Sequence, residues 1–535
     1  MYGIAIDIGT SGIRAQALDI NKNEVISTVI TLKHPLPGAN VVDHLHFALK
    51  VGLDVAHNLL ITDINKVIEG LNIDLSKVIR VAVCGNPIQL SLFHNIEIRD
   101  LAYWGDDVME RMNITPPSRN STITSPDKIG LNLNKDAQIL IPPAIKHEIG
   151  ADALAMLYKS GVLNKDGIFL VIDFGTNAEI ALVIDGEIFA CSAAAGPAIE
   201  GQNIKYGRLA SPGVISDLEE VGLDWKNLVL NNDLKVVDGD IIDPMDGNVS
   251  KNANLDFEIK GITGTGVIAT FSLGQDGGII EDSKIETDDG LIHLQGDISI
   301  SPDDISNIGK ALGAFRAAFL TLAEDSGILL EDIDAVYMAG ASGFYVDPLK
   351  SINVGQIPPT SKNIYQVGNT SLDMAQDIVF NPKLLDTLQD IANSMRSNHI
   401  MLALSDTFEK IYSLELALYD QNMPFWKYNE WLQKYGFQTV PEAETDPNVE
   451  RLFERDIEDL GFNGLSVIDI GATFETSFDG CTGCLTCINE CPENAISYDD
   501  GKITLRTDRC LGLGCQKCVL SCPEKVFDYN KFFKK

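Results

Sequence analysis

The chain has 535 residues, a length that predicts three or four domains, each able to bury its own core. Its formal charge of −35 argues against a nucleic-acid partner, because the phosphates would repel it. The sequence opens on an apolar segment without a basic leader and has no run of ~18 uninterrupted apolar residues, the length needed to cross a bilayer. We therefore expect a soluble, cytoplasmic protein with no membrane partner.

An internal repeat organises the first two thirds of the chain. Residues 3–20 and 170–185 each read as an apolar strand that ends in Asp-x-Gly-Thr and continues into a second apolar strand. The tip of such a hairpin presents backbone N–H groups and hydroxyls that can cradle phosphate oxygens, while Asp7 and Asp173 can hold Mg²⁺. Two facing copies would clamp one nucleotide. The alternative is a pair of unrelated hairpin turns.

A third element follows the second hairpin. Residues 303–326 have the apolar spacing of an amphipathic helix, and Gly327 ends it. A buried strand that begins at Ala335 then breaks into the glycine-rich run 340–343. Glycines at this place let the backbone approach a flat ligand such as adenosine.

Residues 381–475 read as a helical, acidic connection. Its aromatic stretch, residues 423–437, indicates a helix packed on its neighbours or, alternatively, a docking surface. We expect residues 442–460 to form a solvated acidic helix. None of the chain's eight histidines lies in a ligand-spaced cluster, although His44 and His46 would share one face of a strand.

Eight of the ten cysteines lie in two runs near the C-terminus, each ending in Cys-Pro. This is the ligand spacing of a ferredoxin with two 4Fe–4S clusters, in which the fourth cysteine of each run serves the other cluster. The expected ligands are Cys481, Cys484, Cys487 and Cys522 for the first cluster, and Cys510, Cys515, Cys518 and Cys491 for the second. The alternative is a pair of zinc sites, which usually use two separated Cys-x2-Cys pairs.

Two details qualify the cysteine pattern. Cys510 and Cys515 are separated by four residues, where the simplest ferredoxins have two. Cys84 and Cys191 remain outside the runs and are expected to be buried as small hydrophobic side chains. Thiolate-ligated clusters need a reducing environment, which again indicates the cytoplasm.

The three nucleotide elements resemble the phosphate-1, phosphate-2 and adenosine motifs of the superfamily that unites actin, sugar kinases and heat-shock ATPases. The matches lie at residues 7–11, 173–177 and 338–343. Residues 84–87, 194–201, 357–359 and 368–369 further resemble the reductive activases of corrinoid proteins, and a C-terminal domain with two 4Fe–4S clusters is similar to the activase of methylamine methyltransferase corrinoid proteins in methanogens. Most of that family carries an N-terminal 2Fe–2S domain, whose place is taken here by the C-terminal cysteine runs.

The resemblance implies a duplicated, ribonuclease-H-like (actin-like ATPase) α/β body followed by an α+β ferredoxin-type domain. We expect halves at 1–165 and 166–380, a helical connection at 381–475 and the ferredoxin domain at 476–535. Asp7 and Asp173 would organise Mg²⁺ and the attacking water. The other residues that the motifs imply for nucleotide binding are Gly9, Thr10, Ser11, Gly175, Thr176, Asn177, Glu200, Gly340, Ser342 and Gly343.

The implied function is ATP-dependent reduction of a corrinoid protein from Co(II) to Co(I), with electrons from an external low-potential donor. The implied partner is the corrinoid protein of a methylamine or related methyltransferase. Three alternatives stay open from the residues: an ATP-driven activator of another reductase, a small-molecule kinase with an added ferredoxin domain, and a nucleotide-dependent filament with a redox sensor.

Overall fold

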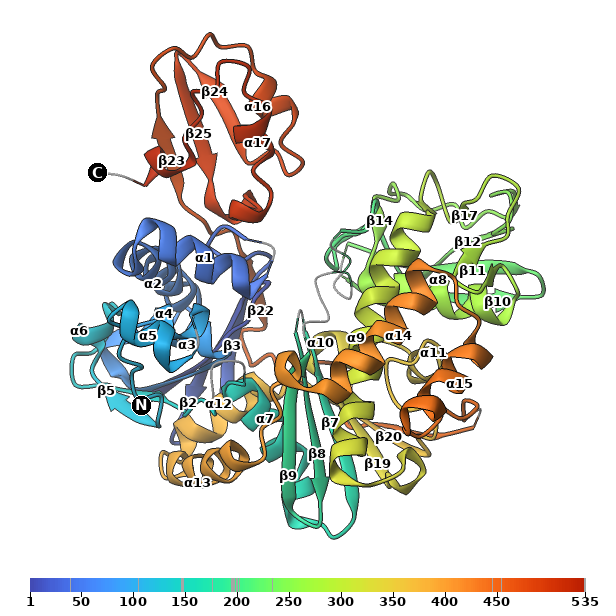
Figure 1. The fold of residues 1–535 in the computed structure, drawn as a ribbon. Coiled ribbons are helices and arrows are strands. Elements are labelled where there is room, and N and C mark those ends of the chain that lie inside the picture. The colour runs from blue at the N-terminus through green and yellow to red at the C-terminus, as the bar shows by residue number, and fades with distance from the viewer. Residues whose placement is uncertain are drawn as a thin grey trace. The chain divides into compact units, whose positions relative to one another are not determined.

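The computed structural model describes residues 1–535 except 39, 104, 146–148, 176, 194–197, 199, 200, 202, 233, 445, 454, 534 and 535. The chain forms two compact units, each assembled from segments that are distant in the sequence (Figure 1). The first unit comprises residues 1–155, 371–396 and 459–535, and the second comprises residues 156–370 and 397–458. The linear division expected from the sequence does not contain this discontinuity.

The first unit is built on a seven-stranded sheet of order β22-β3-β2-β1-β4-β6-β5. Its strands are β1 (Tyr2–Ile8), β2 (Ile13–Asp19), β3 (Glu24–Thr31), β4 (Val78–Gly85), β5 (Thr122–Thr124), β6 (Gln138–Ile141) and β22 (Leu465–Ile468). Its helices are α1 (Val41–Val51), α2 (Leu53–Gly70), α3 (Pro87–His94), α4 (Arg99–Ala102), α5 (Asp106–Arg111), α6 (Pro126–Ile129) and α13 (Leu384–Ser397). β1 lies between two strands and is covered by helices, so it is buried along almost its whole length, and its sequence is accordingly almost continuously apolar.

The second unit contains a six-stranded sheet of order β21-β20-β19-β7-β8-β9. Its strands are β7 (Ile168–Phe174), β8 (Ala178–Ile184), β9 (Glu187–Ala193), β19 (Ala335–Ala339), β20 (Asn363–Gly368) and β21 (Asn448–Arg451). A separate sheet of order β13-β12-β11-β10-β14 uses β10 (Val214–Val221), β11 (Asp224–Leu230), β12 (Val236–Ile242), β13 (Val249–Lys251) and β14 (Gly261–Ile262). Its helices include α8 (Gly264–Asp276), α9 (Pro302–Ser326), α10 (Gly340–Tyr345), α11 (Pro348–Asn353), α14 (Asp406–Asp420) and α15 (Phe425–Tyr435).

The two large sheets share one topology, which confirms the duplicated fold. The order β3-β2-β1-β4-β6 in the first unit corresponds to β9-β8-β7-β19-β20 in the second. Both hairpins of the sequence repeat are antiparallel, and the first strand of each pairs in parallel with the strand on its other side. Helix α7 (Ala151–Ser160) and helix α12 (Thr370–Phe380) lie where the chain passes from one unit to the other.

Helix α9 confirms the amphipathic helix expected at residues 303–326. Ser301 and Asp304 form a capping box at its start, and Gly327 adopts the left-handed conformation (φ +70°) at its end. Helix α14 packs along α9, and the pair buries the ion pair between Arg316 and Glu415 at 3.3 Å. Cys84 and Cys191 are buried in β4 and β9, as expected.

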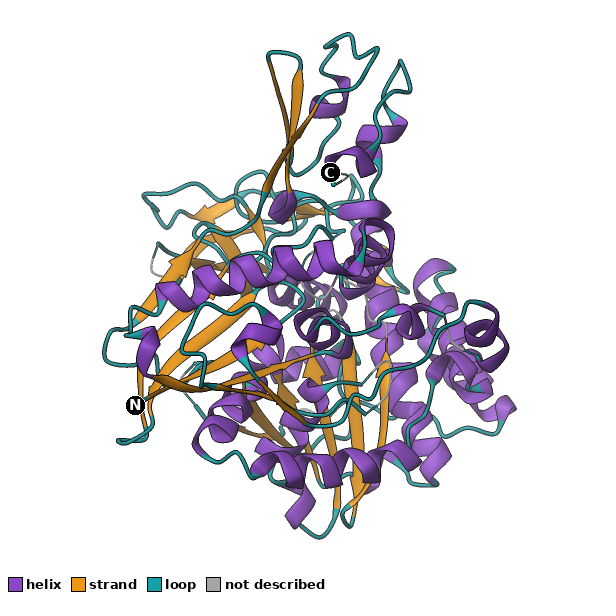
Figure 2. Ribbon diagram, turned by 90° about the vertical axis from the view of Figure 1, so that its left-hand side faces the viewer, coloured by secondary structure: helices purple, strands orange, loops and turns teal. Residues whose placement is uncertain are grey.

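The ferredoxin-type domain folds around the three-stranded sheet β23-β25-β24 and two one-turn helices; these short elements are seen at the top of Figure 2. Its elements are β23 (Thr473–Thr476), β24 (Ile496–Asp499), β25 (Lys502–Arg506), α16 (Thr486–Asn489) and α17 (Lys517–Leu520). The core of the domain is aromatic: Phe478 contacts Phe527 and Phe532, and Phe474 contacts Phe533.

Two local expectations were wrong. Residues 442–460 do not form the acidic helix: residues 448–451 form strand β21, which pairs in parallel with β20. His44 and His46 lie on helix α1 and not on a strand. The aromatic stretch does form a helix, α15, which packs against α14. No helix among the described residues is long and apolar enough to cross a membrane.

Candidate functional site

The first phosphate hairpin joins β1 to β2. Asp7 lies near the end of β1 with a side chain only 7% exposed, and its carboxylate is 3.4 Å from the Arg14 guanidinium. The backbone N–H of Ile13 donates to the Thr31 hydroxyl at 2.8 Å, which ties the return strand to the end of β3. Gly9, Thr10 and Ser11 form the partly exposed turn between the strands. A buried carboxylate beside a tip of backbone N–H groups suits a magnesium–phosphate ligand.

A second carboxylate, which the sequence analysis did not single out, interacts electrostatically with Asp7 of this hairpin. Burial raises the pKa of Asp152, on the first turn of α7, to about 6, and the negative charge of Asp7 contributes. Burial and then the same two carboxylates raise the pKa of the Cys84 thiol well above its usual value. Asp7 and Asp152 therefore repel one another electrostatically, and a bound divalent cation would reduce this repulsion. Asp152 stands outside the repeated motif, so nothing in the sequence distinguished it.

The second phosphate hairpin joins β7 to β8 in the other unit. The Gly175 N–H donates to the Asn177 carbonyl at 3.2 Å, which closes the tip, and Asp173 lies one residue before the end of β7. Thr176 lies outside the described residues. So does Glu200, with most of the run 194–201 around it.

The glycine-rich element meets this hairpin. Gly340 adopts φ +78° at the junction of β19 and α10, and a Cβ there would lie 2.4 Å from the Asp173 carboxylate. A Cβ at Gly343 would lie 2.6 Å from the Phe174 ring. The two motifs, far apart in sequence, thus close on one another, and only glycine permits the approach. Ser342 lies on the same short helix.

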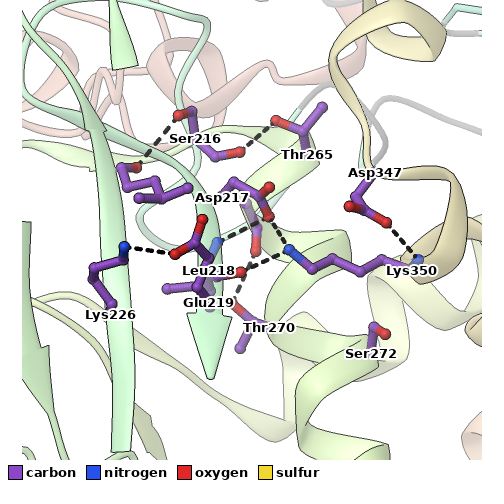
Figure 3. A network of polar contacts seen from close by, with 12 residues as sticks. Ser216, Asp217, Leu218, Glu219, Lys226, Thr265, Thr270, Ser272, Asp347 and Lys350 are labelled. Carbon is purple, nitrogen blue, oxygen red and sulfur yellow. Dashed lines mark hydrogen bonds and ion pairs between the residues drawn. The ribbon is translucent and has the colours of Figure 1, made fainter. Parts of the chain in front are cut away.

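A polar network fixes the segment that follows the glycine-rich run (Figure 3). The Lys350 ammonium reaches from α11 to the Asp217 carboxylate at 2.5 Å and to the Leu218 carbonyl at 2.6 Å, both on β10. The Asp347 carboxylate accepts from the Lys350 backbone N–H and caps α11. Burial raises the pKa of Asp217 although Lys350 opposes the shift. The network anchors the candidate adenosine element to the five-stranded sheet.

The eight clustered cysteines divide between two hollows of the ferredoxin-type domain. One hollow is lined by Cys481, Cys484, Cys487 and Cys522 together with apolar side chains. The other hollow is lined by Cys491, Cys510, Cys515 and Cys518. Each hollow takes three thiols from one run and the fourth from the other run. This is the grouping that the spacing predicts for two 4Fe–4S clusters.

The electrostatics of the thiols follow the same division. Burial and then Cys510, Cys491 and Cys515 raise the pKa of Cys518 to about 12. Burial raises the pKa of Cys487, and Cys481, Cys484 and Cys522 contribute to the shift. Crowded thiols of this kind need positive charge before they ionise, and iron supplies it when bound.

Backbone donors complete the second hollow. The Ala495 N–H lies 3.3 Å from the Cys491 sulfur and the Gly512 N–H lies 3.4 Å from the Cys510 sulfur. Hydrogen bonds to cluster sulfurs are one of the ways in which a protein tunes iron–sulfur potentials. Nowhere in the described chain do three or more His, Cys, Asp or Glu side chains converge on the position of a single metal ion. The residues fit clusters, because the thiols surround a cavity.

Three family profiles match the chain in succession. Residues 2–165 match the RACo middle region, residues 167–429 match the C-terminal domain of RACo, the ASKHA domain, and residues 480–527 match the 4Fe-4S dicluster domain. The chain therefore combines an ATPase-like fold with a 4Fe–4S domain.

Two curated proteins are similar over most of their length. The chain is 44% identical over 518 residues to the [Co(II) methylated amine-specific corrinoid protein] reductase of Methanosarcina barkeri, covering 96% of this chain and 95% of that protein. It is 24% identical over 447 residues to the corrinoid activation enzyme RamQ of Eubacterium limosum, covering 79% and 71% respectively. Among solved structures, a reductive activator for a corrinoid, iron-sulfur protein shares the fold with a TM-score of 0.63 and 23% identity, covering 78% of this chain and 66% of that one.

Proposed function

The chain belongs to the family of corrinoid protein reductive activases, and from this membership we propose that it reduces the Co(II) state of a corrinoid protein to Co(I) in an ATP-dependent reaction. The observation that carries the proposal is the presence, in one chain, of the duplicated phosphate hairpins and of two four-thiol hollows. We further propose that the partner is the corrinoid protein of a methylamine or related methyltransferase, and that an external low-potential donor supplies the electron.

The overall reaction balances as two coupled processes. One electron leaves the external donor and one cobalt(II) becomes cobalt(I), while ATP and water give ADP and phosphate. When bound, two 4Fe–4S clusters would provide one-electron carriers between the donor and cobalt. Every 100 mV by which cobalt lies below the donor requires about 2.3 kcal/mol per electron. ATP can supply that free energy only if it favours a conformation that binds the two states of the partner differently.

The chain's own residues divide this work. We propose that Asp7 and Asp173, one from each phosphate hairpin, organise Mg²⁺ and the attacking water. We assign the phosphate oxygens to Thr10, Ser11, Thr176 and Asn177, with the backbone at Gly9 and Gly175. Gly340, Ser342 and Gly343 would contact adenosine, and Glu200 would complete the nucleotide site. The cysteines would hold two clusters in the grouping of the two hollows.

The test is an anaerobic assay with the purified protein, a Co(II) methylamine corrinoid protein and a chemical reductant. We expect the visible band of Co(I) to appear only when ATP and Mg²⁺ are present. Asp173→Asn should abolish both ATP hydrolysis and cobalt reduction while the iron content stays unchanged. Asp325→Asn, which alters an exposed carboxylate on α9 of the same unit, is the matched control and should behave as wild type. Cobalt reduction at the same rate without ATP would contradict the proposal.

A further inference from the structure

The ferredoxin-type domain contacts the body of the first unit through the residues that make its second cysteine run unusual. Three of the four residues between Cys510 and Cys515 form a 3₁₀ turn, Gly512–Gly514. Gly512 has φ +73°, and a Cβ there would lie 3.3 Å from both the Gly38 Cα and the Pro37 carbonyl oxygen. The Gly38 N–H donates to the Cys510 carbonyl at 2.9 Å. The insertion between two thiols of the second hollow is therefore a docking contact.

Further contacts hold the same face of the domain. The Phe533 ring packs edge-on against Phe47 of helix α1, with ring centroids 4.9 Å apart. The Lys33 ammonium lies 3.4 Å from the carboxylate of Glu493, which lines the second hollow. The hollow of Cys491, Cys510, Cys515 and Cys518 thus faces residues 33–38 and 40–47 of the body, here called the docking segment.

A buried polar relay holds the docking segment in place. His34 and His44 stack with centroids 4.1 Å apart, and Gln89 of helix α3 bonds to both rings. The Leu36 N–H donates to His34 Nδ1 at 3.1 Å, so the opposite nitrogen of His34 donates to the Gln89 carbonyl oxygen. The Gln89 amide then donates to His44 Nδ1 at 2.7 Å. The donor or acceptor role of each group in this chain of hydrogen bonds is fixed by the group before it. The relay therefore has a single hydrogen-bonding arrangement.

The relay ends beside Gly38. His44 Nε2 is buried and has no hydrogen-bond partner within the described chain. A Cβ at Gly38 would lie 2.9 Å from the adjoining carbon of the same ring. The His44 ring therefore forms the surface against which Gly38 rests, and Gly38 in turn holds the Cys510 carbonyl.

Helix α3 connects the relay to the first phosphate hairpin. Its N-cap, Asn86, accepts from the N–H groups of Ile88 and Gln89 and points its amide at the Thr10 hydroxyl, 3.5 Å away. A second connection runs along β3: the Thr31 hydroxyl accepts from the Ile13 N–H and donates to the Lys33 carbonyl at 2.9 Å. Both connections to the docking segment, one through helix α3 and one through β3, therefore start at the first phosphate hairpin.

We propose that the His34–Gln89–His44 relay is a positioning element that couples nucleotide occupancy of the first phosphate hairpin to the seating of the second cluster. The inference rests on the proposed function, since it assumes a nucleotide at that hairpin. A nucleotide bound at Thr10 would alter the contact between Thr10 and Asn86, the N-cap of α3. A change in the position of α3 would move Gln89 and the two histidine rings. Gly38, which rests on the His44 ring, would then shift the loop that carries Cys510. The second hollow, whose lining residues Glu493 and Gly512 contact the docking segment, is on this basis the one that responds to ATP.

The test is hydrogen–deuterium exchange on the anaerobic holoprotein, with and without Mg²⁺ and a non-hydrolysable ATP analogue. In the wild type we expect the analogue to slow exchange at the hairpin, residues 8–13, and also at residues 510–514, by about fivefold or more. In Gln89→Met the hairpin should still respond, whereas residues 510–514 should not. Gln16→Met is the matched control: Gln16 is fully buried and bonds to Thr28 and Asp459, away from the relay, so its response should match wild type.

A second pair of variants serves if Gln89→Met fails to fold. Gly512→Ala adds a methyl group against Gly38, while Gly501→Ala places alanine at a similar positive φ (+78°) in open space on the same domain. We expect only Gly512→Ala to lose the response at residues 510–514. A responding hairpin with unresponsive residues 510–514 in the wild type would overturn the inference and leave the proposed function standing. An unresponsive hairpin in the wild type would refute the nucleotide assignment and the inference with it.

Discussion

Gly340→Ala isolates the contact between the glycine-rich run and the second phosphate hairpin. The substitution adds one methyl group 2.4 Å from the Asp173 carboxylate oxygen and 3.1 Å from the Phe174 carbonyl oxygen. An ordinary contact begins at 3.4 Å, so the carboxylate oxygen must retreat by 1.0 Å (3.4 minus 2.4). A displacement of ~1 Å in a catalytic group can cost about 100-fold in rate. We therefore expect ATP hydrolysis to fall by about 100-fold if Asp173 acts as proposed.

The variant also forces alanine into the left-handed region, which costs about 1–2 kcal/mol by itself. Gly436→Ala provides the control for that cost, because Gly436 caps α15 in the same unit with φ +85° and has nothing within 4 Å of its Cβ position. The two variants should lose similar stability from the backbone term, and only Gly340→Ala should lose hydrolysis.

The assay is phosphate release under anaerobic conditions, with thermal unfolding and iron content measured on the same preparations. Iron should stay unchanged in both variants, because neither substitution touches the ferredoxin-type domain. Wild-type hydrolysis by a folded Gly340→Ala protein would refute the role assigned to Asp173. Equal loss of hydrolysis in Gly436→Ala would show that stability, and not the contact, governs the rate.

Three further outcomes are expected. Cys491→Ser should lower iron to about four per chain and remove the cluster of the second hollow although Cys491 belongs to the first run; EPR of the reduced protein identifies which cluster is lost. Glu415→Leu should destabilise the second unit by about 3–5 kcal/mol in thermal unfolding, because it leaves the Arg316 charge buried without its partner. Burial lowers the pKa of His34 to about 3 and that of His44 well below its usual 6.5. Stability present above pH 6.5 should therefore be lost as pH falls from 6.5 toward the lowered pKa values, by up to about 1.4 kcal/mol per pH unit for each histidine, and His44→Asn should make this loss less steep in denaturant titrations.

The elements that could be predicted from the sequence are those whose signal is local. Each phosphate hairpin is a contiguous apolar–glycine–apolar run, and α9 carries its capping box and its terminal glycine within one segment. The duplicated fold followed from the repeat of one such hairpin. Cysteine spacing likewise encodes the grouping of thiols, because each run folds into a tight loop.

The elements that could not be predicted depend on pairing across long stretches of chain. Strand β21 is exposed along its whole length and is polar at three of its four positions, so its sequence resembles a solvated helix; it is a strand because β20 offers a free edge. Asp152 gains its significance only from the proximity of Asp7. The two histidines of the relay become a pair only when Gln89, 45 residues after His44, bonds to both rings. No periodicity within one segment contains this information.

The free energies of the docking segment's contacts are similar in size to the free energy of a change of about 100 mV in reduction potential. An aromatic pair such as Phe47 and Phe533 contributes about 0.5–1.5 kcal/mol beyond its buried area, and one backbone hydrogen bond such as that from Gly38 contributes about 0.5–1.5 kcal/mol. The exposed pair of Lys33 and Glu493 adds about 1 kcal/mol at most. Making or breaking part of this set changes the free energy by about 1–3 kcal/mol, the usual size of a coupling between two sites. That is comparable with about 2.3 kcal/mol for each 100 mV. A modest rearrangement of the docking segment would therefore suffice to shift the second cluster's potential by an amount that matters for cobalt, if the contacts that change differ between the two redox states of the cluster.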